Sequence, residues 1–130
     1  MTDPSPCFHQ SDFNDLLPPE GLYASVIDRT RFRTSSSGNM TLQVIYQLSD
    51  APAGHDTVAD YFVLSGSSER GLAVSRRRLI ELYRACGLHP RHGDLIRPED
   101  LQGLKLQVRL GHESYEGQMR LRVLGYRAMP

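Results

Sequence analysis

Arginine residues spaced two apart are the feature of this sequence that best suits ligand binding. Arg29, Arg31 and Arg33 alternate with other residues, and in a β-strand this spacing places all three side chains on one face. Arg120 and Arg122 repeat the spacing near the C-terminus. Proteins that bind single-stranded nucleic acid combine a basic groove for the backbone with aromatic side chains on which bases stack. The pattern therefore predicts a surface that contacts phosphates and bases.

The candidate binding residues follow from side-chain type and from the face that each strand is expected to expose. Phosphate contacts are expected from seven basic residues: Arg29, Arg31, Arg33, Lys105, Arg109, Arg120 and Arg122. Base stacking is expected from three aromatic residues: Tyr61, Tyr115 and Tyr126. A solvated strand face explains any single arginine equally well, so the hypothesis depends on the whole set.

Other chemistry finds little support in the sequence. Two small clusters resemble metal sites: His89 and His92 with Asp94, and the aspartates Asp28, Asp56 and Asp60. The first lies in a loop rich in Pro and Gly and lacks cysteines, and the second has no specific spacing. The chain has no G-x-S-x-G elbow, P-loop or dinucleotide fingerprint. We expect a protein that is not an enzyme and needs no metal or cofactor.

The charge of the chain is balanced overall but unevenly distributed. The 15 basic and 15 acidic residues give a net charge of zero at pH 7. Residues 1–20 hold four of the acids and no Lys or Arg, which leaves 15 basic and 11 acidic residues in the remainder. Lys105 is the only lysine, and an Arg bias of this kind suits nucleic acid. A genome of high GC content would produce the same bias.

Alternating apolar residues and turn signals predict the elements that must position these side chains. Strands are expected near 20–33, 40–48, 57–64, 104–110 and 119–126, with a helix over 75–86 capped by Ser75 and ended by Gly87. Residues 69–74 could form an earlier turn of that helix. The order β-β-β-α-β-β is that of a mainly β, five-stranded OB-fold barrel. Alternation also permits a sandwich or a half-open barrel.

The same alternation predicts which side chains face the core. Leu22, Ala24 and Val26 are expected inward in the first strand, and Tyr126 is expected outward in the last. Successive helical residues point about 100° apart, so we expect the run 76–78 of three arginines to form a solvated helix surface. In OB-folds the ligand crosses strands 2 and 3 between two loops, which correspond here to 34–39 and 112–118.

The N-terminal residues 1–19 read as an acidic, Pro-containing arm before an OB-fold domain over 20–130. The arm mixes acids with Phe and Leu, so it could dock on a partner, cover the basic face and compete with DNA, or pack on apolar surface. No secretory signal or membrane-length apolar run is present, so a cytoplasmic location is expected. Cys7 and Cys86 read as free thiols, although Cys7 could form an intermolecular bridge.

Six short segments carry a family resemblance: Asp12-Phe13-Asn14-Asp15, 17–23, 33–42, 82–88, 100–104 and 113–117. Together they resemble a family of small phage and prophage proteins regarded as single-stranded-DNA-binding or recombination-associated OB-fold proteins. The resemblance implies an accessory role in replication or recombination and supplies no catalytic residues. Two departures stand out. Arg33 and Ser36 replace lysines that are frequent in the family, and the C-terminus lacks the acidic tail of many single-strand binders.

The leading hypothesis is sequence-tolerant binding of single-stranded DNA in phage or mobile-element replication or recombination. The alternative is an OB-type protein-interaction module, such as an assembly or inhibitor protein, and zero net charge favours it. A metal-dependent nuclease is a weaker third hypothesis. Expected partners are single-stranded DNA and, through the N-terminal arm, a replication or recombination protein. No membrane partner is expected, and the sequence permits a homodimer without indicating an interface.

Overall fold

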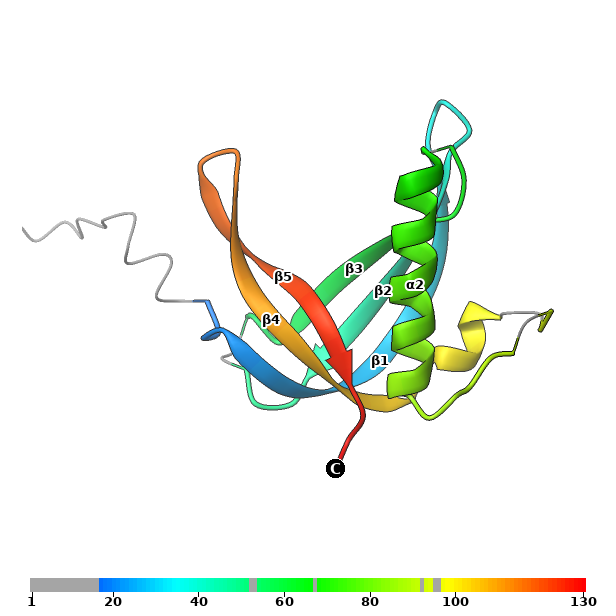
Figure 1. The fold of residues 1–130 in the computed structure, drawn as a ribbon. Coiled ribbons are helices and arrows are strands. Elements are labelled where there is room, and N and C mark those ends of the chain that lie inside the picture. The colour runs from blue at the N-terminus through cyan, green and yellow to red at the C-terminus, as the bar shows by residue number, and fades with distance from the viewer. Residues whose placement is uncertain (1–16, 52–53, 67, 92, 95–96) are drawn as a thin grey trace, which may run out of the picture.

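The computed structural model of the chain is mainly β, with five strands and one α-helix among the residues it describes (Figure 1). It describes residues 17–51, 54–66, 68–91, 93–94 and 97–130. In chain order the elements are β1 (Gly21–Thr34), β2 (Met40–Leu48), β3 (Thr57–Val63), α2 (Glu69–Ala85), the 3-10 turn η1 (Pro98–Leu101), β4 (Lys105–Tyr115) and β5 (Gln118–Arg127). The predicted order of strands and helix is confirmed. The predicted arm lies largely outside the described residues.

All five strands form one antiparallel sheet in the order β3-β2-β1-β4-β5. The long strand β1 is central, since its first half pairs with β4 and its second half pairs with β2. β3 and β5 are therefore the two edges of the sheet, and both run in the same direction as β1. No ladder joins these two edges within the described residues, and α2 packs against both of them. The sheet curls around the helix without closing through hydrogen bonds.

A β-bulge in β1 corrects the predicted inward face of that strand. The register of the β1–β2 ladder shifts between Ile27 and Arg29, so the side-chain alternation changes phase at Asp28. Before the bulge Ser25 and Ile27 face the core, and Leu22 is exposed. The expected inward placement of Leu22, Ala24 and Val26 is therefore wrong. After the bulge the three arginines at 29, 31 and 33 are exposed, as predicted.

The helix begins about two turns before the expected start. Ser68 is the N-cap, and its side chain accepts a hydrogen bond from the backbone N–H of Gly71. Ser75 is instead buried inside the helix, where its Oγ accepts a hydrogen bond from the backbone N–H of Val63 on β3 at 3.1 Å. Residues 69–74 belong to the same helix. At its end, Gly87 adopts a φ of 85°, the left-handed conformation that favours glycine after a helix.

The core fills the space between the concave side of the sheet and α2. Its fully buried members include Ile27, Leu42, Tyr46, Phe62 and Leu82. The hydroxyl of Tyr83 is buried without a hydrogen-bond partner in the described part of the chain. None of the helices in the described ranges is long and apolar enough to cross a membrane.

Burial of ionisable core groups predicts a loss of stability at alkaline pH. Burial raises the pKa of the Cys86 thiol from 9.0 to about 11. Burial, together with the nearby negative charges of Asp100 and Glu99, raises the pKa of the Tyr83 hydroxyl from 10.0 to about 12. The unfolded chain ionises these groups first, so their stabilising contribution is complete below about pH 9 and is lost as pH rises through 11 and 12. The urea midpoint should fall above pH 9, and Cys86→Ala should reduce the fall between pH 9 and 10. A midpoint that stays constant up to pH 11 would contradict this expectation.

Candidate nucleic-acid interface

An open groove of about 590 Å³ lies along the seam between the edge strands β3 and β5. One wall is formed by β3 residues 57–61 and the other by β5 residues 119–123. Leu17, His55, Arg78 and Glu113 complete the lining. Three of the predicted binding residues, Tyr61, Arg120 and Arg122, line this single groove. Strands far apart in the sequence therefore bring part of the candidate site together.

A polar row crosses the outer face of the sheet and ends at this groove. Arg31 on β1 pairs in register with Gln43 on β2, and Gln43 pairs with Tyr61 on β3. The Nε2 group of Gln43 donates a hydrogen bond to the Tyr61 hydroxyl at 3.1 Å. Tyr61 is 50% exposed, so its ring is held at one end and remains accessible. This row supplies a basic side chain and a positioned aromatic face on one continuous surface.

The β4–β5 hairpin places its arginines on the opposite wall of the groove. The Arg120 guanidinium lies over the Tyr115 ring, with its carbon 4.0 Å from the ring centroid. Its Nε contacts Glu113 at 3.0 Å, and Arg122 contacts the same carboxylate at 3.5 Å. Because these pairs are partly exposed, they contribute little stability and can exchange for another anion. Glu113 therefore orients both arginines while offsetting part of their charge.

The strands of this hairpin run further than predicted, and the turn is shorter. Only Glu116 and Gly117 lie between β4 and β5, and both have positive φ angles, 51° and 79°. This is the geometry of a tight type I′ hairpin turn, which matches the twist of the flanking strands. Tyr115 is consequently the last residue of β4, where Arg120 covers its ring.

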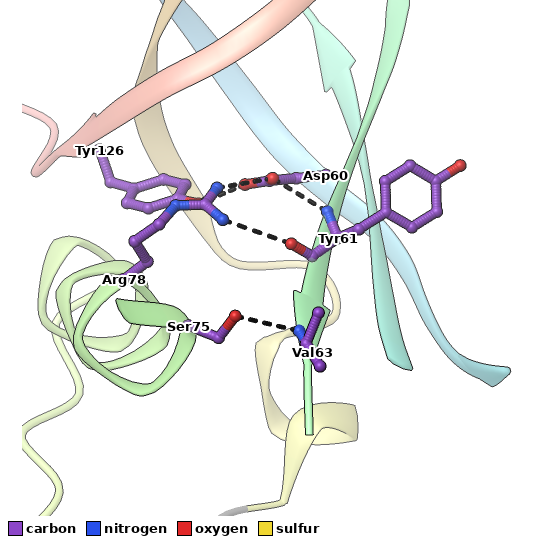
Figure 2. Close-up of polar contacts among 6 residues, drawn as sticks. All are labelled: Asp60, Tyr61, Val63, Ser75, Arg78 and Tyr126. Carbon is purple, nitrogen blue, oxygen red and sulfur yellow. Dashed lines mark hydrogen bonds and ion pairs between the residues drawn. The ribbon is translucent and has the colours of Figure 1, made fainter. Parts of the chain in front are cut away.

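A polar cluster closes the other end of the seam, and Tyr126 belongs to it (Figure 2). Nη2 of Arg78, on α2, lies 2.7 Å from Oδ1 of Asp60 on β3 and 3.0 Å from the Tyr126 hydroxyl on β5. The Tyr126 hydroxyl donates a short hydrogen bond to the other Asp60 oxygen. Asp60 also accepts from the backbone N–H of Tyr61 at 2.9 Å. We call Asp60, Arg78 and Tyr126 the seam cluster.

The seam cluster overturns two expectations. The expected outward position of Tyr126 is wrong, because the β4–β5 register shifts at Leu124 and turns the ring inward beside buried Val108. Burial and the neighbouring Asp60 carboxylate raise the pKa of Tyr126 well above its ordinary value. The expectation of a solvated surface over 76–78 is wrong for Arg78. Its guanidinium also lies over the Phe62 ring, with the guanidinium carbon 4.9 Å from the ring centroid.

Sequence reasoning missed Arg78, although a usable signal was present. Ser75, Arg78, Leu79 and Leu82 follow an i, i+3, i+4, i+7 spacing, so they share the face of α2 that packs on the sheet. An arginine on that face requires a buried acidic partner. Asp60 meets this need, because it faces inward beside Val44 at a position where alternation predicts an apolar residue.

The remaining predicted residues lie on the outer face but away from the groove. Arg29 and Arg33 flank Arg31 on the second half of β1, and Asp28 lies 3.9 Å from Arg29. Lys105 and Arg109 are exposed on β4, where they pair with the first half of β1. They belong to a different flank of the curled sheet, so the structure divides the predicted site into two parts.

Asp28, Asp56 and Asp60 do not assemble into a metal site in the part of the chain that the structure describes. No three His, Cys, Asp or Glu residues gather there in a way that could hold a metal ion. Asp60 contacts Arg78, and Asp94 accepts a hydrogen bond from the backbone N–H of Arg91 at 2.6 Å. His92 lies outside the described residues.

Fold and site together define a mainly β domain with a basic, tyrosine-containing groove at an open sheet seam. No protein-family model matches the chain, and no curated protein sequence matches it at a significant level.

Proposed function

We propose that this chain is an OB-type protein that binds single-stranded DNA across β1, β2 and β3 and into the groove between β3 and β5. The strand order, with β3 and β5 running parallel on either side of the seam, supports an OB barrel that side chains close in place of a hydrogen-bonded ladder. The proposed path runs between the β1–β2 and β4–β5 hairpins, which splay apart in Figure 1.

The observation that carries the proposal is the setting of Tyr61. Its ring is half exposed, its hydroxyl is held by Gln43, and Figure 2 shows the ring directed away from the seam cluster. Arg31 lies in the same register row, and Arg122 lines the same groove. A base stacked on this ring would therefore have arginines on both sides for the adjoining phosphates.

Salt dependence of DNA binding tests the proposal. Fluorescence anisotropy with labelled oligo-dT should show binding at low salt and a steep loss of affinity as salt increases. Four phosphate contacts predict a slope of log affinity against log salt of about −2.8, which is roughly a 50-fold loss between 50 and 200 mM. No binding at 50 mM salt would end the proposal. The cellular setting proposed is replication or recombination of a phage or mobile element in the cytoplasm.

The pairing of Glu113 with Arg120 and Arg122 favours a second candidate, an OB-type protein-interaction module. A groove with alternating charges suits a polar protein surface as well as a phosphate backbone. A pull-down partner that survives nuclease treatment, together with the absence of oligo-dT binding, would support this function over the first.

A further inference from the structure

The edges of β3 and β5 that face the groove lack strand partners in the described structure. Among the strands that the structure describes, β3 pairs only with β2, and β5 pairs only with β4. Uncovered edges present backbone N–H and C=O groups that an added extended segment can pair with. On β3 the N–H groups of Tyr61 and Val63 already bond to the side chains of Asp60 and Ser75, so the open part of that edge lies before Tyr61. The seam cluster occupies one end of the seam, at Asp60, and the groove leaves the rest open between β3 residues 57–59 and β5 residues 119–123. The geometry suits an extended peptide.

The lining of the groove specifies the chemistry of that peptide. Three arginines, Arg78, Arg120 and Arg122, face two acids, Asp60 and Glu113, so the charged lining keeps an excess of positive charge. Apolar side chains, including those of Val58, Leu121 and Val123, lie between them. A peptide that carries both acidic and large apolar side chains would complement this surface.

The chain itself brings such a segment to the edge of the groove. Leu17 is part of the groove lining. The residues that follow are anchored on β4, where the His112 ring Nε2 lies 2.7 Å from the Pro18 carbonyl oxygen and the His112 backbone N–H donates to Glu20 at 3.0 Å. Residues 1–16 therefore start next to the groove. They contain Asp3, Asp12 and Asp15, the apolar residues Phe8, Phe13 and Leu16, and no Lys or Arg.

We propose that residues 1–16 dock in the β3–β5 groove as an extended, acidic segment and compete there with single-stranded DNA. Sixteen extended residues reach about 50 Å, more than the five residues of the β3 wall require. Tethering raises the local concentration of the segment to the order of 1 mM, so even a weak contact is well populated. The competition rests on the proposed function, whereas the docking does not.

Paramagnetic relaxation on the full-length protein tests the docking without DNA. Cys7 lies in the segment and accepts a thiol-reactive spin label, while burial raises the pKa of the Cys86 thiol to about 11 and slows its labelling at neutral pH. The label should broaden backbone amide signals of residues 57–61 and 119–123. A matched control, Cys7→Ser with Ser36→Cys labelled in the β1–β2 loop, should leave those signals sharp. Sharp groove signals in the Cys7-labelled protein would overturn the proposal.

Mixing experiments distinguish docking by the chain's own segment from docking by the segment of a second copy. Spin-labelled protein at natural isotope abundance is mixed with 15N-enriched protein that carries no spin label. Groove signals of the 15N-enriched protein should remain sharp, because the docking is within one molecule. Broadening in this mixture would show that a second copy supplies the segment, and it would overturn the proposal.

Charge neutralisation tests the competition. The full-length variant D3N/D12N/D15N should bind oligo-dT about tenfold more tightly than the natural protein, if the groove binds the segment with an affinity on the order of 0.1 mM. The control D50N/E69Q/E81Q changes the net charge equally at exposed residues outside the groove lining. An equal gain in both variants would overturn the competition, because general electrostatics would then suffice. Absence of DNA binding in every variant would refute the proposed function and leave the docking test to stand on its own.

Discussion

Replacing Arg78 with leucine should destabilise the protein by about 3 kcal/mol, because it leaves the Asp60 carboxylate buried without its positive partner. The Asp60 side chain is 9% exposed, whereas that of Arg78 is 32% exposed. The expected loss of stability therefore lies at the lower end of the free-energy range for breaking a buried ion pair. The seam would also lose the contact between Arg78 and the Tyr126 hydroxyl that links α2 to β5. Urea unfolding measures the change, which corresponds to roughly 10 °C in melting temperature.

Two control variants show whether the buried charge is responsible. Arg77→Leu changes the neighbouring exposed helix residue and should alter stability by less than about 0.5 kcal/mol. Asp60→Asn combined with Arg78→Leu removes both charges, so the double variant should recover part of the loss. Equal destabilisation by the two arginine variants would show that the seam cluster does not hold β3 to β5.

Tyr61→Ala should weaken binding of oligo-dT by about tenfold, within the range of about 5- to 150-fold that follows from 1–3 kcal/mol per stacked base. The ring of Tyr61 lies on the outer face and is 50% exposed, so its removal leaves the core intact. Stability should therefore change little while affinity falls. Fluorescence anisotropy measures the affinity, and thermal unfolding monitors the fold.

Tyr61→Phe is the matched control for this prediction. It keeps the aromatic face and removes only the hydroxyl that accepts a hydrogen bond from Gln43. Binding should stay close to that of the natural protein, with a small loss from freer motion of the ring. Unchanged binding by Tyr61→Ala would exclude base stacking at this position.

The outcome for individual residues shows where sequence patterns succeed. Alternation correctly places Arg120 and Arg122 outward and Val123 inward, because β5 is regular up to that point. It fails at Ile27 and at Tyr126, because each lies beside a register shift. A bulge adds one residue to one strand and reverses the phase of everything beyond it. The amino-acid pattern carries no clear mark of either bulge.

The sequence by itself determined the element order, the exposed arginines of β1 and β5, and the turns that separate the strands. These features depend on neighbouring residues, whose spacing and turn propensity act locally. Only the tertiary structure decided that the sheet stays open at β3 and β5, and that Asp60, Arg78 and Tyr126 meet at the seam. Those three residues come from three elements, and the curl of the sheet around α2 sets the distances between them. The basic groove exists because this packing leaves two strand edges apart.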